Sequence, residues 1–362
     1  MKKLSDQKTI LVAPLDWGLD HATRCIPIIQ SLLDQQHKVI IASSGKQEAL
    51  LKEEFPDLPF IKLEGYSIDY PNDGSMVIKM LWQLPKIKKA IEEEHSWLDK
   101  VIDKHKIDEV VSDNRYGLWN KKVKSIIVTH QLFIKAPTGE WLIERVLKRY
   151  LDNFDEVQIP DIEGADNLSG DLSHKKPLPS NYKFIGLLSR FSNQKVSSNT
   201  PIKSCHPESN RRTDNFEYDF IAIVSGPEPQ RTIFEKLILE QVEDTDLKGV
   251  LVRGLPENSC HSELIEEDKK TLRQAQYDKK RLKIFNHLSK VEFLNYLEKS
   301  KVVISRSGYS TIMDLSVLDK KAILVPTPGQ TEQEYLAEYH QLKKSHSYQK
   351  QIVELKNLFL CS

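Results

Sequence analysis

The feature that most constrains the fold of this sequence is an alternation of short β-branched runs with stretches of helical periodicity. Such alternation is typical of parallel sheets covered by crossover helices. In the first half, strands are predicted at Thr9–Pro14, Lys38–Ala42, Glu109–Ser112, Ser125–Thr129 and Glu156–Ile159. Between the first two, apolar residues recur at helical spacing at Ala22, Ile26, Ile29 and Leu33. The chain therefore opens with a strand-loop-helix-strand unit.

The alternation stops after about Asp161 and starts again near residue 220, beyond the polar stretch Ser192–Asn215. There the predicted strands are Phe220–Val224, Val250–Arg253, Lys283–Phe285, Val302–Ser305 and Ala322–Val325. The predicted helices are Thr232–Gln241, Val291–Lys299, Ser310–Leu318 and a segment from Glu332. A length of 362 residues suits two domains. We predict two α/β domains, at 1–165 and 219–345, with a connecting region at 166–218 and a tail at 346–362 that is free to pack back on the first domain.

Charge and cysteine usage exclude several classes of protein. Lys+Arg and Asp+Glu both total 52, so the chain lacks the basic excess of most nucleic-acid-binding domains. No apolar run approaches the roughly 18 residues of a membrane span, and the N-terminus lacks the apolar centre of a secretory signal. The four cysteines are scattered without metal-ligand spacing. We expect a cytoplasmic protein without nucleic-acid or metal sites.

A long amphipathic helix is predicted from Met76 to Lys104, with Pro85 expected to break or kink it. Its basic and aromatic part, Met76–Lys89, is compatible with peripheral contact with a membrane surface. The adjacent Glu92, Glu93 and Glu94 favour a helix at the domain edge with a solvated face.

Residues that follow predicted strands are the candidates for chemistry, because ligands of open parallel sheets bind beyond the carboxyl ends of the strands. His21 lies in the loop and helix start after the first strand, where only Gly18 of a dinucleotide-binding glycine pattern is present. Asp113 follows the strand Glu109–Ser112. If these two strands are neighbours, Asp113 orients His21 for use as a general base. Otherwise each has an ordinary structural role, as a lone histidine and a turn cap.

Three later segments have the small and polar residues of a phosphate or sugar site. Gly226 permits close backbone approach, and Gln230 to Thr232 open a helix whose free N–H groups favour phosphate, as does Arg231. The segment Ser305-Arg306-Ser307-Gly308 also leads into a helix, in which Asp314 is placed to accept hydrogen bonds from a ribose. After the next strand, Glu332 and Gln333 offer groups for sugar hydroxyls.

These motifs resemble the donor-binding domain of glycosyltransferase family 28, the group around the peptidoglycan N-acetylglucosaminyltransferase. Ser305-Arg306-Ser307-Gly308-x-x-Thr311-x-x-Asp314 is similar to that family's C/S-R-S/A-G-x-x-T-x-x-E signature, and Glu332-Gln333-x-x-x-Ala337 is similar to its D/E-Q-x-x-N-A motif. Gly18-Leu19-Asp20-His21 resembles a GxGH loop, with Asp20 where a second glycine is usual. Because a carboxylate repels a diphosphate, Asp20 either points away from the donor or weakens its binding.

The resemblance implies a GT-B fold, in which two Rossmann-like domains face each other across a cleft, and an acceptor site in the first domain. It implies an inverting transfer of a sugar from a nucleoside diphosphate sugar, with a UDP-sugar as the expected donor, to a hydroxyl acceptor, lipid-linked or a cell-envelope glycan. Because no DxD-like metal-binding pair lies in the loops described above, we predict that the transfer is metal-independent. No cofactor is expected. The predicted catalytic residues are His21 and Asp113. The predicted donor-binding residues are Gly18, Gly226, Gln230, Arg231, Thr232, Asn286, His287, Ser305, Arg306, Ser307, Gly308, Thr311, Asp314, Gly329, Gln330, Glu332 and Gln333.

Two alternatives remain open at this stage. One is a UDP-sugar 2-epimerase of the same fold, which would need further acidic residues in the cleft. The other is a non-catalytic protein that binds a nucleotide sugar, which Asp20 and Leu336, where the family has asparagine, make conceivable. Lipid-linked acceptors of the family would imply contact with the inner membrane face.

Overall fold

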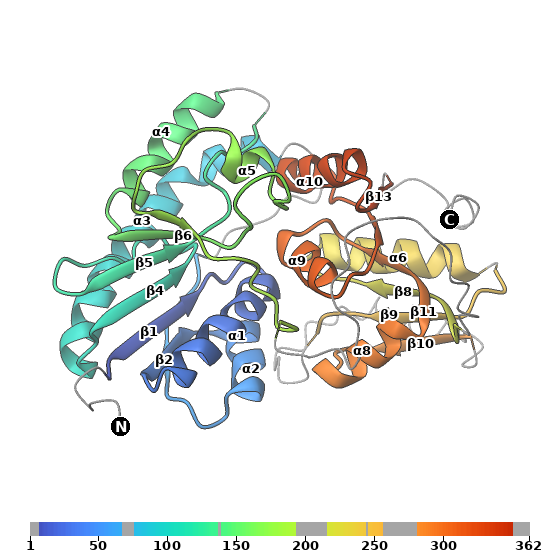
Figure 1. The fold of residues 1–362 in the computed structure, drawn as a ribbon, viewed down its shortest axis with the longest axis horizontal. Helices are drawn as coiled ribbons and strands as arrows, with labels where there is room; N and C mark the ends of the chain where they lie inside the picture. Colours follow the sequence, from blue (N-terminus) through green and yellow to red (C-terminus); the bar gives the residue numbers. More distant parts are fainter. Residues whose placement is uncertain are drawn as a thin grey trace.

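A computed structural model describes residues 7–66, 76–136, 139–192, 216–243, 245–255 and 281–349, with the side chains of 76–84 left out. Its described part forms two lobes, each built on a twisted parallel sheet (Figure 1). Helices α9 and α10 of the second lobe face the first lobe (Figure 1). The predicted pair of α/β domains is therefore confirmed.

The first sheet has the strand order β3-β2-β1-β4-β5-β6-β7, and every pairing is parallel. Its strands are β1 (Thr9–Pro14), β2 (Lys38–Ser43), β3 (Phe60–Lys62), β4 (Glu109–Asp113), β5 (Lys124–Val128), β6 (Glu156–Ile159) and β7 (Tyr182–Phe184). Its helices are α1 (Leu19–Asp34), α2 (Gly45–Glu54), α3 (Met76–His105), α4 (Glu140–Leu151) and α5 (Asp171–His174).

The second sheet has the order β10-β9-β8-β11-β12-β13 and is again parallel throughout. Its strands are β8 (Tyr218–Ile223), β9 (Gly249–Val252), β10 (Leu282–Phe285), β11 (Ser300–Ser305), β12 (Ala322–Leu324) and β13 (Ser347–Tyr348). Its helices are α6 (Gln230–Glu243), α8 (Lys290–Glu298), α9 (Tyr309–Val317) and α10 (Thr331–Leu342).

Strand β1 shows why its lobe has helices on both faces. Ile10 and Val12 pack in one buried cluster with Ile29 of α1, whereas Leu11 and Ala13 pack in another that includes residues of α3. Successive side chains of a strand point to opposite faces, so a strand apolar at every position must be covered twice. This double covering fixes β1 in the centre of the sheet.

Several local features differ from the sequence predictions. Strand β3 and helices α2, α4 and α5 were not predicted. Strand β7 lies within the predicted connecting region but pairs with β6, so the first sheet extends to Phe184. Strand β13 pairs with β12 of the second sheet, so residues 347–348 of the predicted tail belong to the second lobe, while 350–362 lie outside the described residues. Helix α3 is continuous through Pro85, which sits within it. Of the predicted break or kink at this proline, the break is therefore wrong.

The order of the strands determines where a ligand can bind. In the first sheet, β2 and β3 lie on one side of β1 and β4 lies on its other side. In the second sheet, β9 and β10 lie on one side of β8 and β11 lies on its other side. The direction in which strands are added therefore reverses beside β1 and beside β8. Such a switch point opens a crevice at the carboxyl ends of its strands. The loops that follow β1, β4, β8 and β11 are those that the sequence singled out. Within the described ranges, no helix is long and apolar enough to cross a membrane.

Candidate functional site

The loop after β1 is held in place by side chains from two other elements. Gln47 of α2 donates from Nε2 to the carbonyl oxygens of Asp16 (2.8 Å) and Gly18 (3.0 Å). Arg115, which follows β4, donates from Nε to the carbonyl of Pro14 at 2.8 Å. Gly18 has a φ of +102°, a region that favours glycine, and immediately precedes α1. The loop therefore delivers the first turn of α1, with His21, to the carboxyl edge of the sheet.

His21 and Asp113 meet at this edge, as predicted. Strands β1 and β4 pair with Pro14 beside Asp113, and Nδ1 of His21 lies 3.1 Å from Oδ1 of Asp113. Asp113 is fully buried, whereas the side chain of His21 retains 13% of its exposure. Nε2 of His21 makes no hydrogen bond within the described ranges. This arrangement can present a ring nitrogen to a substrate while the carboxylate fixes the other.

Arg24 completes this pair from the next turn of α1. It donates from Nε to Oδ2 of Asp113 at 3.0 Å and from Nη2 to Oδ1, a bidentate contact in which both side chains are buried. Burial alone would raise the pKa of Asp113, but Arg24 and His21 outweigh it and hold that pKa well below its usual range. Nη2 of Arg24 also lies 2.9 Å from Nδ1 of His21. Arg24 and Asp113 thus compete for Nδ1, because a guanidinium can only donate to it and a carboxylate can only accept.

Asp20 points into the predicted phosphate site and not away from it. Its Oδ2 lies close enough to Gly308 that a Cβ on this glycine would be 3.1 Å away. Ser310 also donates from Oγ to the carbonyl oxygen of Asp20 at 3.2 Å. Burial raises the pKa of Asp20, partly offset by His21 and Arg24. Asp20 therefore faces the predicted position of the diphosphate, and its effect on donor binding stays a prediction.

The segment from Ser305 to Thr311 forms the end of β11 and the first turn of α9. Gly308 is the N-cap of α9 and provides no side chain to cap the helix. Ser305 and Ser307 are buried, and Ser307 donates from Oγ to the carbonyl of Gln333 at 2.7 Å. Thr311 is half-buried in the first turn. Free N–H groups at the start of a helix attract anions, so the predicted place of a diphosphate stays consistent with the geometry.

Arg306 is turned into the second domain. Its Nη1 donates to the carbonyls of Val325 (3.2 Å) and Pro326 (3.1 Å), and its Nη2 donates to that of Gln230 (3.2 Å). The guanidinium also lies 4.0 Å from the ring centroid of Phe234, and burial lowers its pKa to about 9. Arg306 therefore ties the loops after β8, β11 and β12 together.

Asp314, the predicted ribose ligand, contacts the end of the first domain. Its Oδ1 accepts a hydrogen bond from Oγ of Ser189 at 2.6 Å, and its Oδ2 lies 3.8 Å from Nε of Arg190. Burial raises its pKa to about 6, although Arg190 lowers it. The side chain is 20% exposed, so a further hydrogen bond from a ligand is sterically open.

The segment 329–333 begins α10 and joins the second domain to the first. Glu332 accepts hydrogen bonds from His130 and Gln131 of the first domain. Gln333 is buried and accepts from the backbone N–H of Thr327 at 2.9 Å. The N–H groups of Gly329 and Gln330 donate to residues directly beside the segment, to Oε1 of Glu334 and to the carbonyl oxygen of Thr327. Of the two predicted sugar ligands, Glu332 thus faces the other domain, and Gln333 braces a loop.

Arg231 is engaged by carboxylates of its own domain. Its Nε donates to Glu228 at 2.5 Å and its Nη1 to Glu235 at 2.6 Å. Thr232 also donates from Oγ1 to Glu228 at 2.8 Å. Gly226 has a φ of +116° and open space where a Cβ would stand. The positive charge on which the phosphate prediction for this loop rested is therefore largely neutralised.

Asn286 and His287 follow β10, at the far edge of the second sheet from β11. Oδ1 of Asn286 accepts from Nη1 of Arg253 at 3.0 Å. His287 is half-buried, and burial lowers its pKa. In the described part of the chain, neither residue forms a hydrogen bond or ion pair with His21, Arg24 or Asp113.

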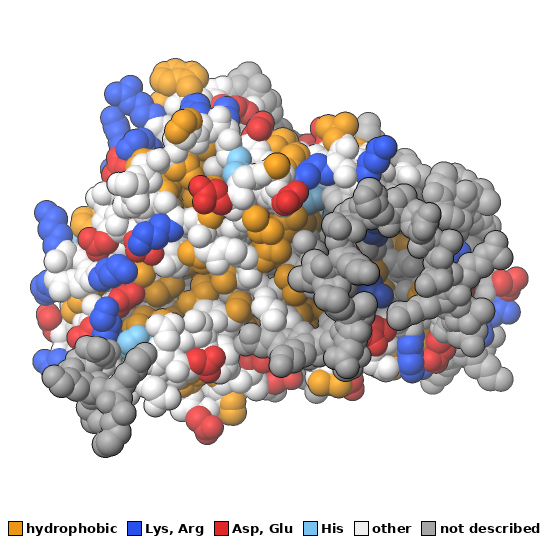
Figure 2. Space-filling model, in the orientation of Figure 1, with side chains coloured by type: hydrophobic (Ala, Val, Ile, Leu, Met, Phe, Trp, Pro, Cys, Tyr) orange, Lys and Arg blue, Asp and Glu red, His pale blue; other side chains and the backbone are white. Residues whose placement is uncertain are grey.

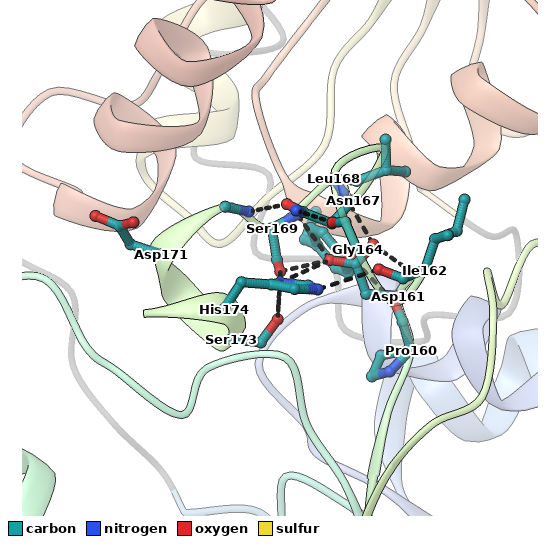
Figure 3. Close-up of polar contacts among 12 residues, drawn as sticks. Pro160, Asp161, Ile162, Gly164, Asn167, Leu168, Ser169, Asp171, Ser173 and His174 are labelled. Atoms are coloured by element: carbon teal, nitrogen blue, oxygen red, sulfur yellow. Dashed lines mark hydrogen bonds and ion pairs between the residues drawn. The ribbon is translucent and has the colours of Figure 1, made fainter. Parts of the chain in front are cut away.

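The segment 160–174 forms much of the domain boundary and contains a Ser-His-Asp group (Figure 3). Asp161 accepts from the backbone N–H (2.9 Å) and Oγ of Ser169, while Nε2 of His174 lies 3.1 Å from the carbonyl of Ile162. In a hydrolytic triad the histidine stands between acid and serine. Here the acid bonds the serine directly, and both are buried. The group is a structural brace for this segment.

Five further residues contact the predicted site residues and were not predicted from the sequence: Arg24, His130, Gln131, Ser189 and Arg190. His130 and Gln131 follow β5, so the rule that selected Asp113 would have found them. Arg24 lies one helical turn after His21, on the same face. Ser189 and Arg190 have no such signal, because they lie in irregular chain after β7. Among the described residues, no cluster of three or more His, Cys, Asp or Glu side chains is arranged to hold a metal ion.

Comparison with known proteins finds one family model that is similar to the second domain. Residues 234–358 match the model of the glycosyltransferase family 28 C-terminal domain. A search of curated proteins with the sequence found no significant match. The match includes Ser305–Asp314 and Glu332–Ala337, so the predicted family resemblance is confirmed for the donor-side motifs.

Solved structures extend the fold comparison to both domains. MurG from Acinetobacter baumannii superposes with a TM-score of 0.50 at 12% identity, covering 98% of this chain and 90% of that one. The calicheamicin glycosyltransferase CalG4 gives 0.57 at 10% identity, with 95% and 86% covered. Arabidopsis thaliana UGT89C1, complexed with UDP-L-rhamnose, gives 0.53 at 10% identity, with 96% and 86% covered. These similarities confirm the GT-B fold. With the family match, they support the predicted enzyme class, a nucleotide-sugar glycosyltransferase.

Proposed function

We propose that this protein is an inverting glycosyltransferase that transfers a sugar from a UDP-sugar to a hydroxyl acceptor. The observation that carries the proposal is the position of the His21–Asp113 pair. His21, bonded to Asp113 at the end of β4, lies in the turn of α1 that contacts the start of α9, where Oγ of Ser310 donates to the carbonyl oxygen of Asp20 at 3.2 Å. The proposed base of the first domain thus lies next to the start of α9 in the second domain, where a helix N-terminus can bind an anion.

The proposed reaction is a single displacement at the anomeric carbon. Nε2 of His21 accepts the proton of the acceptor hydroxyl as its oxygen attacks, and the bond from the anomeric carbon to the diphosphate breaks. Nδ1 then donates to Oδ1 of Asp113, whose low pKa keeps it ionised to stabilise the imidazolium. One displacement at this carbon inverts its configuration.

The leaving diphosphate would be stabilised by the N-terminal end of α9, where the N–H groups of the first turn carry partial positive charge. In this proposal Asp314 binds the ribose and Glu332 accepts hydrogen bonds from hydroxyls of the donor sugar. We propose that these groups suffice without a metal ion, so that EDTA leaves the rate unchanged. The UDP-L-rhamnose held by UGT89C1 supports a UDP donor for this fold.

His21→Ala tests the assignment of the base. Turnover should fall at least ~100-fold, in the range measured for loss of a general base, while the Kd for UDP stays within about twofold. A thermal-shift panel of nucleoside diphosphate sugars first identifies the donor, because a ligand stabilises the state that it binds. Near-normal turnover of the variant would refute the role of His21. Conversion of a UDP-sugar to an isomer without any acceptor would instead identify an epimerase.

We also propose that the acceptor is lipid-linked and that the protein contacts the cytoplasmic face of a membrane through α4. Trp141, Leu142 and Val146 are 68%, 52% and 43% exposed on this helix, beside the exposed Arg145 and Arg149. At the corner of the molecule that α4 occupies, Figure 2 shows hydrophobic and basic side chains together. Tryptophan and arginine on one helix face suit the headgroup region of anionic lipids.

Sedimentation with phosphatidylglycerol vesicles tests this contact. Binding should be lost at high salt and reduced at least ~5-fold by Trp141→Ala, because the helix loses its largest inserted side chain and salt screens the arginines. Val291→Ala is the control, since Val291 is 72% exposed on α8 of the other lobe. Equal loss of binding in both variants would contradict a contact through α4.

A further inference from the structure

His130 lies at the boundary between the domains and is almost fully buried, at 4% exposure. Its ring stacks on that of Tyr309 at the start of α9, with centroids 4.0 Å apart and planes inclined by 10°. Its Nε2 lies 2.8 Å from Oε1 of Glu332, and its Nδ1 lies 3.4 Å from Nη1 of Arg24. Both ring nitrogens are engaged, so His130 has none to offer as a base.

Arg24 determines which ring nitrogen of His130 carries the proton. A guanidinium can only donate, so Nη1 faces a lone pair on Nδ1, and the proton of the neutral ring is on Nε2. Burial lowers the pKa of His130, although Glu332 raises it, which favours this neutral ring. Nε2–H therefore donates to Glu332. Hydrogen bonds thus run from Asp113 through Arg24 and His130 to Glu332 in the second domain.

The second oxygen of Glu332 is also held by the first domain. Gln131 donates from Nε2 to Oε2 of Glu332. The neighbouring Thr331 donates from Oγ1 to the carbonyl of Lys135 at 2.7 Å, which ties the start of α10 to the same segment. Each carboxylate oxygen has two lone pairs, and the side chain of Glu332 keeps 24% of its exposure. It can therefore accept further hydrogen bonds from a ligand without losing those from His130 and Gln131.

We propose that His130 and Gln131 are positioning residues for the donor sugar. They hold the carboxylate of Glu332 in place, so the sugar subsite is complete only when both domains contribute. This inference rests on the proposed function, in which Glu332 accepts hydrogen bonds from sugar hydroxyls. It predicts that a residue of the first domain affects recognition of the sugar but not of the nucleotide.

The test compares the Kd values of UDP and a UDP-sugar by calorimetry. UDP-glucose and UDP-N-acetylglucosamine are the probes, and the one that binds the wild-type protein more tightly is used. In His130→Ala the ratio of Kd for the UDP-sugar to Kd for UDP should rise at least ~10-fold, with UDP itself within about twofold. His130→Gln should restore most of the loss, because its amide can donate from nearly the same place as Nε2. Gln131→Ala should move the ratio in the same direction by at least ~3-fold.

The matched control is His340→Ala. His340 is another buried histidine, which bonds the carbonyl of Leu168 at 2.9 Å, so its loss should lower the Tm without changing the ratio. An unchanged ratio in folded His130→Ala, or equal weakening of both ligands, would overturn the positioning role while leaving the proposed function intact. If His130→Ala does not fold, an unchanged ratio in Gln131→Ala decides against it. A wild-type protein that binds neither UDP nor a UDP-sugar would overturn the proposed function and this inference together.

Discussion

Replacing Asp20 by asparagine should strengthen the binding of a nucleoside diphosphate. The carboxylate lies over Gly308, the N-cap of α9, where a Cβ would be 3.1 Å from Oδ2. If about 5 Å is taken as the separation between this carboxylate and a phosphate at the first turn of α9, two unit charges at an effective dielectric constant of about 20 repel by about 3 kcal/mol, or about 100-fold in affinity. Water and the nearby Arg24 reduce this repulsion, so at least ~10-fold tighter binding of UDP is expected.

Calorimetry with UDP and uridine at several pH values measures this effect. The gain should be larger for UDP than for uridine, because only UDP carries the phosphates. Burial raises the pKa of Asp20, so at low pH the wild-type carboxyl is partly neutral and resembles asparagine. The ratio of wild-type to Asp20→Asn Kd should therefore rise with pH. Other charged and titratable groups surround Asp20 and are present in both proteins, so their own effects on Kd largely cancel in the ratio. These groups are His21, Arg24, His130, Asp314 and Glu332.

Asp34→Asn is the control, because Asp34 is an exposed carboxylate at the opposite end of α1. It removes one negative charge from the protein without altering the start of α9. A Kd ratio below about 2 for Asp20→Asn at pH 8 would refute the placement of the phosphates at α9. So would a UDP affinity that needs Mg²⁺ in the wild-type protein and is lost in Asp20→Asn, since Asp20 would then be a metal ligand.

Three further predictions concern nucleotide binding and stability. Asp314→Ala should weaken UDP at least ~10-fold in calorimetry through loss of the ribose contact, and an unchanged Kd would contradict that role. Asp113→Asn should cost about 3–5 kcal/mol at pH 7 in chemical denaturation, because it breaks a buried ion pair. The folded-state pKa of Asp113 is depressed, so this deficit is fully present above about pH 4 and should shrink as the pH falls; a deficit that does not change with pH would argue against the ion pair. Gly170→Ala should lower the Tm more than Gly164→Ala. Both glycines have a positive φ, but only the Cβ added at Gly170 would meet a side chain, 2.3 Å from Oη of Tyr335. Equal Tm values in the two variants would show that Tyr335 moves away without cost.

Most of the fold could be predicted because its signals are local. Strands β1 and β6 have the predicted bounds, and α1 follows its apolar periodicity, since each depends on side chains within a few residues. Strand β7 was missed because its three residues have no pattern of their own and are strands only by pairing with β6. Pro85 shows the converse, since α3 continues through a residue that usually ends a helix.

In the candidate site, too, some contacts could be predicted from the sequence and others could not. The contact of His21 with Asp113 could be predicted, because it depends only on which strands are neighbours and on where each strand ends. The ion pairs of Arg231 could not be predicted. Two carboxylates of its own domain, Glu228 and Glu235, neutralise its charge, and the sequence alone does not give their distances from the guanidinium. A charge in a predicted loop is evidence for an anion site only when its partners are known.

The surroundings of Asp20 also change the interpretation of this residue. From the sequence alone, an acid in place of a glycine indicates a phosphate loop that binds its ligand weakly. In the structure the same carboxylate lies at the start of α9, where the donor's diphosphate is proposed to bind, beside both His21 and Arg24. An acid in this place lowers the affinity for every anion, and it lowers it most for the leaving nucleoside diphosphate, which carries more charge than the donor sugar nucleotide. The proposed enzyme would then gain in release of product what it loses in binding of donor, and Asp20→Asn should raise the affinity for UDP more than that for the UDP-sugar.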